Sequence, residues 1–130
     1  MSKEFVLIFM IFCHIFDDYK IQAGVLNNLK QKSWWKENAP DKLYKYDYII
    51  GLIMHSLSWS FMIMLPIAIY YNFNINIDFV IMFIGNAILH AHVDNLKANK
   101  KLINLVVDQS IHILQIIITF IRFCIFGFMI

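Results

Sequence analysis

The chain is short of charged residues, glycines and reactive motifs, and each shortage excludes a class of protein. Only 15% of its 130 residues are charged and 60% are hydrophobic, whereas a soluble domain of this length needs a more polar surface. Four glycines form neither a phosphate-binding loop nor a dinucleotide fingerprint. The sequence also offers no serine or cysteine nucleophile arrangement. The composition therefore favours an integral membrane protein.

Cysteine usage and net charge exclude further classes. Cys13 and Cys124 lie in separate apolar segments without CxxC spacing, so neither a disulfide nor a cysteine zinc site is indicated. A formal net charge of +2 is too small to suggest binding to nucleic acid. The apolar run 5–13 leads directly into His14 and Asp17 without a small-residue cleavage site, so we do not expect a cleavable signal peptide.

Four apolar segments predict an all-α protein with four transmembrane helices in a single domain, residues 1–130. The predicted spans are about 5–24, 48–71, 77–96 and 102–126. A spanning helix needs roughly 20 apolar residues, and a helix satisfies its own backbone hydrogen bonds in lipid. The first segment is polar toward its end, and it is predicted to span the membrane only because it fits the series with the three other segments. Pro66 is expected to kink the second.

The distribution of basic residues predicts the orientation in the membrane. Nine of the eleven lie either at the polar end of the first segment or in the two connections after the first and third segments. By the positive-inside rule both connections are cytoplasmic. This predicts a protein of the bacterial inner membrane with both termini on the non-cytoplasmic side. Trp34 and Trp35 in the first connection are either interfacial anchors on a short helix along the membrane or part of a solvated loop.

The histidines and three aspartates are predicted to occupy one layer near the cytoplasmic side. Three His–Asp pairs have members four residues apart, which places both on one face of a helix; they are His14 with Asp18, His90 with Asp94, and Asp108 with His112. At a rise of about 1.5 Å per residue, they lie roughly 5–15 Å below the membrane edge. Apart from Arg122, the outer halves of the helices carry almost no ionisable group.

Three such faces turned inward would surround a central cavity with imidazoles and carboxylates. Facing helices that carry an acid and a histidine one turn apart build metal sites in soluble bundles. Mixed nitrogen and oxygen ligands suit zinc, manganese or iron, with one or two ions bound. The predicted metal ligands are His14, Asp18, His55, His90, Asp94, Asp108 and His112. Asp17 could replace or supplement Asp18, and His92 should point away.

A purely structural alternative is a set of buried His–Asp hydrogen bonds that hold the helices in register. Polar contacts between membrane helices contribute only about 0.6–2 kcal/mol each. Each buried carboxylate costs roughly 2.5–3.5 kcal/mol even on the lenient insertion scale. Three buried carboxylates are therefore better explained by a metal site, while a proton or cation relay remains a second functional alternative.

Three polar residues close to the pairs are candidates for contacts with a substrate. Gln22 lies two turns beyond His14, and Gln109 follows Asp108; both could instead be amides at a wet helix end. Lys97 shares the face of His90. It could bind an anionic group such as phosphate or extend to the headgroups.

The order of these motifs resembles a known family. The chain reads His14-x-x-x-Asp18-Tyr19-x-x-Gln22, then His55, then His90-x-x-x-Asp94-x-x-Lys97, then Asp108-Gln109-x-x-His112. This pattern resembles small bacterial and phage membrane proteins called domain of unknown function 3307, and it covers nearly the whole chain. Tyr19 stands where we would expect phenylalanine. The resemblance implies the site but no activity, whereas a looser likeness to membrane-bound metal-dependent hydrolases implies hydrolysis.

The sequence thus predicts a metal-dependent membrane hydrolase whose site opens to the cytoplasm. Metal-bound water would be the nucleophile, and Asp18, Asp94 or Asp108 the general base. The substrate would be a phosphoester or amide, either in a lipid headgroup or in a soluble small molecule. Two alternatives are a non-catalytic phage or bacterial protein that acts on a host membrane protein, and a proton relay. The apolar outer halves of the helices argue against the relay.

Overall fold

The protein is entirely helical over residues 1–127, the part of the chain that the computed structural model describes. The first helix, α1, is followed directly by a π-helix, η1, and the last, α6, by a second π-helix, η3. The elements are α1 (Lys3–Phe16), η1 (Asp17–Ile21), α2 (Val25–Leu29), α3 (Lys32–Asn38), η2 (Lys42–Tyr44, a 3-10 turn), α4 (Asp47–Tyr70), α5 (Ile77–Ala98), α6 (Leu105–Phe120) and η3 (Ile121–Ile125). The predicted all-α fold class is confirmed.

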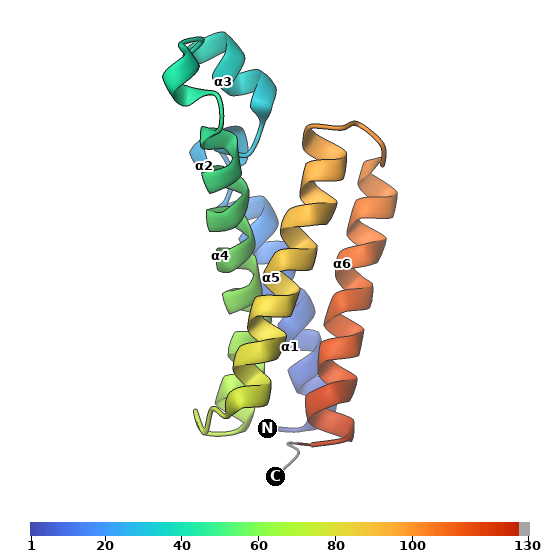
Figure 1. Ribbon diagram of the computed structural model, residues 1–130. Coiled ribbons are helices and arrows are strands. Elements are labelled where there is room, and N and C mark those ends of the chain that lie inside the picture. The colour runs from blue at the N-terminus through green and yellow to red at the C-terminus, as the bar shows by residue number, and fades with distance from the viewer. Residues whose placement is uncertain (128–130) are drawn as a thin grey trace.

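Helices α1, α4, α5 and α6 run alongside one another as an elongated bundle (Figure 1). Helices α2 and α3 and the α5–α6 connection lie at one end, which we call the loop end; the N-terminus and the α4–α5 connection lie at the other. Three of the described helices are long and apolar enough to cross a membrane, over 42–70, 77–98 and 105–125. Helix α1 is shorter and ends in the polar η1, so its membrane crossing remains a prediction, as does the position of the termini.

Asparagine side chains fix where two of the long helices begin. Asn76 accepts a hydrogen bond from the Phe79 amide, and Asn104 accepts one from the Val107 amide, at 3.1 and 3.0 Å. These N-caps satisfy amide groups that have no partner within the first turn of a helix. The fourth predicted span therefore begins slightly later than residue 102.

The bundle has an apolar outside, and its inside changes character along its length. Large apolar side chains such as Ile8, Phe61, Ile81 and Leu114 are exposed on its sides. Away from the loop end, α1, α4, α5, α6 and η3 enclose a hydrophobic core formed by residues such as Val6, Ile63, Ile67, Ile116 and Phe123. Toward the loop end, most of the histidines and aspartates are buried as well. An apolar exterior around a polar interior fits lipid contact better than contact with water.

The α2–α3 connection is held against the bundle by close packing and hydrogen bonds. A Cβ atom added to Gly51 of α4 would overlap the carbonyl group of Leu29 and lie 2.7 Å from the Lys30 amide nitrogen. The Trp35 indole donates to the Leu29 carbonyl at 2.8 Å. Asn99, just after α5, donates to the Lys30 carbonyl at 3.0 Å and accepts from the Lys32 amide at 2.7 Å. These contacts fix the backbone of Lys30, whose side chain points into the bundle.

We predict that Gly51→Ala destabilises the fold by about 1–3 kcal/mol, because the added methyl group must displace the Leu29–Lys30 backbone. Thermal unfolding of the purified protein in detergent measures the effect. Gly85→Ala is the matched control, since Gly85 also lies within a long helix and a Cβ there would meet nothing within 4 Å. Equal unfolding temperatures for the two variants would show that the close contact of α2 with α4 is unimportant.

Candidate metal centre

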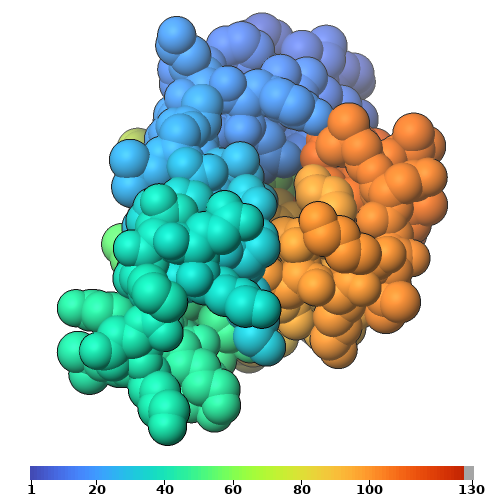
Figure 2. Space-filling model, turned by 90° about the horizontal axis from the view of Figure 1, so that it is seen from above, coloured from blue at the N-terminus to red at the C-terminus, as the bar shows by residue number. Residues whose placement is uncertain are grey.

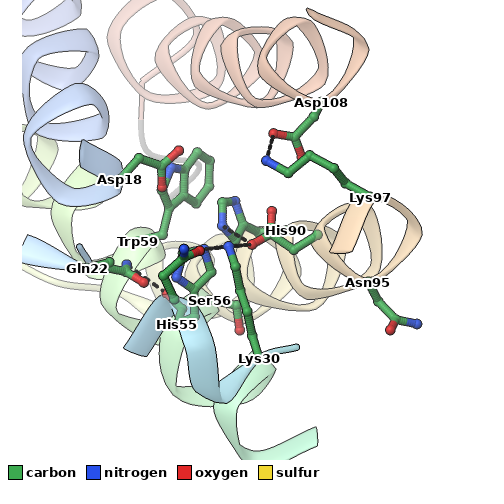
Figure 3. A network of polar contacts seen from close by, with 12 residues as sticks. Asp18, Gln22, Lys30, His55, Ser56, Trp59, His90, Asn95, Lys97 and Asp108 are labelled. Atoms are coloured by element: carbon green, nitrogen blue, oxygen red, sulfur yellow. Dashed lines mark hydrogen bonds and ion pairs between the residues drawn. The ribbon is translucent and has the colours of Figure 1, made fainter. Parts of the chain in front are cut away.

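All seven predicted metal ligands come together inside the bundle, at the loop end. Helix α1 with η1, helix α4, helix α5 and helix α6 each contribute at least one of them. Figure 3 shows Asp18 and Asp108 on two sides of the cluster, with Lys30 reaching toward His55 and His90 from a third. The side chain of Asp18 is 11% exposed. The other six are buried: His14, His55, His90, Asp94, Asp108 and His112. His92 is exposed on the outside of α5, as expected.

The Asp94 carboxylate is at the centre of this cluster. Its Oδ2 atom lies 2.6 Å from Lys30 Nζ and 2.6 Å from His55 Nε2. Its Oδ1 atom lies 3.3 Å from His112 Nε2. Helix α4, helix α6 and the α2–α3 connection thus meet at a single carboxylate of α5, and the charge of Lys30 compensates its burial.

Asp108 forms a second, adjoining group of contacts. Lys97 Nζ lies 2.5 Å from Asp108 Oδ2, and the Gln109 amide donates to the same oxygen at 3.1 Å. Asp108 Oδ1 lies 3.3 Å from His112 Nε2. His112 Nε2 therefore lies between two carboxylates, those of Asp94 and Asp108.

A chain of amides fixes the orientation of the His112 ring. Gln115 Nε2 donates to the Asn86 carbonyl at 3.2 Å, so its oxygen Oε1 faces His112 Nδ1 at 3.2 Å. An amide oxygen only accepts, and His112 Nδ1 therefore carries the hydrogen. Asn86 is held in turn by Thr119, to whose hydroxyl it donates at 2.9 Å. Metal-binding histidines are commonly oriented by such a hydrogen bond from the nitrogen that does not bind the metal.

His14 is held by hydrogen bonds at both ring nitrogens. The Trp59 indole, which can only donate, contacts His14 Nδ1 at 2.8 Å, so this nitrogen is the acceptor. His14 Nε2 then donates to Gln109 Oε1 at 3.0 Å. Asp18 lies 3.6 Å from His14 Nδ1, beyond hydrogen-bond distance. His14 thus orients Gln109 in this structure and offers no free nitrogen to a metal.

His90 differs from His14 because its ring has close aromatic neighbours but no hydrogen bonds among the described residues. Its ring is stacked between Trp59 and His112, with ring centroids 4.2 and 4.1 Å away, and its exposed fraction is 0%. Neither ring nitrogen has a hydrogen-bond partner within residues 1–127, and its closest carboxylate oxygen, Asp94 Oδ2, is 3.7 Å from Nε2. A buried polar atom without a partner costs about 1–3 kcal/mol. Four further buried atoms in the described residues also lack a hydrogen-bond partner: Asp18 Oδ1, Gln22 Oε1, His55 Nδ1 and Asp108 Oδ1, the last of which still lies 3.3 Å from His112 Nε2.

Two groups of these residues have ligand atoms close enough to hold a metal ion. One is His90, Asp94 and His112, and the other is Asp18, His55 and His90; within each, the three atoms lie within 4.8 Å of one another. Ligands at about 2.0–2.2 Å from a tetrahedral ion are roughly 3.5 Å apart, so modest side-chain rotations close either group around an ion. His14 and Asp108, both predicted ligands, belong to neither group.

The site contains more carboxylates than ammonium groups. Asp17, fully buried, accepts hydrogen bonds from Ser58 and Gln22. With Asp18, Asp94 and Asp108 it makes four carboxylates, against the two ammonium groups of Lys30 and Lys97. The carboxylates of the site thus outnumber its ammonium groups, and a cation would add to this balance. The number of ions remains as predicted from the sequence, one or two.

A cavity of about 320 Å³ adjoins the cluster. It is lined mainly by polar side chains, which include Asp18, Lys30, His55, Asp94, Lys97 and Gln109. Of the three predicted substrate contacts, Lys97 and Gln109 therefore lie on its wall. Gln22 does not: it is buried beside Asp17 and donates to the His55 carbonyl at 3.1 Å.

Sequence reasoning missed two residues of this cluster. Lys30 was counted with the lysines of a cytoplasmic connection, yet it is only 6% exposed and binds Asp94. Trp59 was not singled out, although it contacts His14 through its N–H group and His90 through its ring. The spacing of Trp59 four residues after His55 was the available signal. For Lys30, the sequence offered no comparable signal.

Comparisons with protein-family models, curated proteins and solved structures found no match to this chain. The resemblance to domain of unknown function 3307 therefore remains a prediction.

We predict that the purified protein binds one or two zinc, manganese or iron ions per chain. His90→Ala should weaken this binding by more than about 10-fold, since it removes a ligand common to both groups. Metal analysis after dialysis against limiting metal measures the ions bound per wild-type chain and the loss of binding in the variant. His92→Ala, an exposed histidine on the same helix, is the matched control and should bind as the wild type does. Metal-free wild-type protein, or equal loss in the two variants, would contradict the site.

Proposed function

We propose that this protein is a metal-dependent membrane hydrolase that cleaves an anionic substrate, a phosphoester, in the cavity beside Asp94. The observation that carries the proposal is His90, which is fully buried with both ring nitrogens unpaired while Asp94 and His112 hold ligand atoms close by. A ligand that binds nitrogen and carboxylate oxygen together would satisfy all three, and a divalent metal ion is such a ligand.

The neighbouring His14 argues against a purely structural network. It has hydrogen bonds at both ring nitrogens, so this bundle can satisfy a buried histidine where it needs only a hydrogen bond. Helices that needed only to be held in register would gain nothing from an unpaired imidazole at the centre. The unpaired His90 is therefore better explained by a bound ion.

The cavity wall favours a phosphoester over an amide. Lys30 and Lys97 place two ammonium groups on it, and cationic groups bind the oxygens of a phosphate while an uncharged amide gains little from them. At about 320 Å³, the cavity is at the small end of small-molecule sites. It suits a group the size of a lipid headgroup or a small soluble phosphoester.

In this proposal the residues have separate roles. His90, Asp94 and His112 would hold the ion, which would supply a water of lowered pKa. Asp18 lies on the cavity wall and has one oxygen without a hydrogen-bond partner in the described part of the chain. It would take a proton from that water while the water oxygen forms a bond to phosphorus. The bond from phosphorus to the leaving oxygen breaks, and that oxygen is protonated from solvent. Lys97 binds the phosphate oxygens, and Asp108, paired with it at 2.5 Å, positions it.

The proposed location is a bacterial inner membrane, with the loop end in the cytoplasm and α1 as a fourth span. The three apolar helices and the apolar sides of the bundle support membrane insertion. Most of the basic residues are gathered at the loop end, which supports this orientation. The cavity would then open near the cytoplasmic headgroup layer.

A proton relay through the bundle is disfavoured by its packing. The polar chain runs from His112 through Gln115 and Asn86 to Thr119, toward the end opposite the loops. Beyond it lies the hydrophobic core formed by residues such as Ile63, Ile67 and Phe123. The described residues thus give no continuous polar path, which a relay needs.

The central test is hydrolysis of phosphoesters and amides by the protein in detergent with added zinc, manganese or iron. We expect phosphoester cleavage that stops with a chelator and returns with metal. Asp18→Asn should lower kcat by about 100-fold or more while the bound metal is retained, because its proposed role is proton transfer. Asp47→Asn, at the start of α4 outside the site, is the control. Full activity of His90→Ala would refute the proposal, and metal-free inactive protein would favour a non-catalytic membrane partner.

A second prediction concerns Lys30, whose ammonium competes with a cation for Asp94. Lys30→Met should strengthen binding of a divalent ion by about 10-fold or more, because a positive charge beside a ligand oxygen is removed. The same variant should raise KM for a phosphoester, since one phosphate-binding group is lost. Metal titration and steady-state kinetics measure these opposite effects. Lys20→Met, an exposed lysine off the cavity wall, should change neither; a variant Lys30→Met that binds metal more weakly would show that Lys30 supports the site.

A further inference from the structure

A second cavity lies outside the metal centre, also at the loop end. Its volume is about 460 Å³, and it lies between α3, the η2 turn and the end of α5. Figure 2 looks down on this end and shows the segment of α3 and η2 beside the connection that follows α5. We call this cavity the basic groove, because its wall carries the lysines Lys32, Lys36, Lys42, Lys45 and Lys101.

The lysines of the basic groove form no ion pair with a carboxylate in the described part of the chain. Only one acidic residue, Asp41, lines it, and that carboxylate accepts a hydrogen bond from the Leu43 amide at 2.9 Å. In the described part of the chain, the lysines that form ion pairs are Lys30 and Lys97, and both belong to the metal centre. The ammonium groups of Lys32 and Lys45 lie over the rings of Tyr48 and Tyr46, 5.5 and 5.2 Å from the ring centroids, and none of the five lysines has a carboxylate partner in the described residues. A cavity bordered by five such lysines favours an anionic ligand.

Aromatic side chains give the basic groove a rigid wall. Trp35 stacks on Tyr44 with ring centroids 6.2 Å apart and an interplanar angle of 18°, and the Trp35 indole is fixed to the Leu29 carbonyl. Trp34 packs edge-on against Trp35 at 5.1 Å. Tryptophan and tyrosine gather where protein meets lipid headgroups, because their rings are apolar with a polar group at one edge.

The position of the basic groove points to a membrane ligand. The apolar segment that contains α4 begins at residue 42, so Lys42 and Lys45 stand at the start of a candidate span. Between and beside them, Leu43 and Tyr46 are 76% and 62% exposed. Exposed apolar groups that alternate with lysines match an interface in which the apolar groups enter lipid and the lysines reach the phosphates.

We propose that the basic groove binds the phosphate headgroup of an acidic phospholipid from the leaflet at the loop end. The lysines contact the phosphate, and Trp35 and Tyr44 pack against the glycerol. This proposal rests on the membrane placement of the chain but not on the hydrolase activity. The basic groove has its own walls, and no residue lines both cavities.

The test is lipid retention by the full-length protein in an uncharged detergent. The protein is mixed with equal amounts of short-chain phosphatidylglycerol and phosphatidylcholine, and bound lipid is counted by native mass spectrometry. The groove variant is Lys36→Gln, Lys42→Gln and Lys45→Gln together. Its matched control is Lys3→Gln, Lys20→Gln and Lys100→Gln, which removes the same charge from exposed positions off the groove wall.

We expect the wild type and the control variant to retain phosphatidylglycerol preferentially. The groove variant should bind it about 100-fold more weakly, because each lysine near an anionic surface contributes roughly fivefold. Equal retention of the two lipids by the wild type, or equal losses in both variants, would overturn the proposal. Displacement of phosphatidylglycerol by millimolar inorganic phosphate would also overturn it, in favour of a soluble anion. Phosphoester hydrolysis, measured separately, distinguishes failure here from failure of the proposed enzyme.

Discussion

The burial of the Asp94 carboxylate is the constraint around which the loop end is built. Three groups from three other parts of the chain contact it, Lys30, His55 and His112. Each sits on a helix or connection that must be placed to within a fraction of an ångström for the contact to form. The lack of a side chain at Gly51, which lets the α2–α3 connection approach α4, is one part of this placement. A misplaced partner would leave a charge in a poorly solvated interior, so contact with Asp94 and correct assembly of the bundle depend on each other.

The two ends of the bundle are stabilised by different forces. Away from the loops, apolar side chains such as Ile63 and Phe123 fill the interior. At the loop end, the interior is held together by hydrogen bonds and ion pairs instead. Burying these polar atoms without partners would cost free energy, which disfavours other arrangements. This division explains how a chain with so few charged residues can place several of them inside. They are confined to one layer, at the loop end.

Sequence patterns predicted the helices and the polar layer, but not how its members would be paired. Helical spacing correctly placed His90 with Asp94 on an inward face and His92 outside, because those are properties of one helix. It could not show that the Trp59 indole would donate a hydrogen bond to His14, since that contact joins residues 45 positions apart. Lys30 was missed for a similar reason. A lysine in a connection is usually solvated, and only the packing of α2 on Gly51 turns this one inward.

The contacts of Trp59 also give the centre a spectroscopic signal of its own. Its indole lies nearly parallel to the His90 ring, at 19°, and is the donor to His14. The other two tryptophans, Trp34 and Trp35, lie in α3, outside this layer. Indole emission is sensitive to ring contacts and to the N–H hydrogen bond. In a protein whose α3 tryptophans are replaced by phenylalanine, the remaining emission would report events at His90 without any added label.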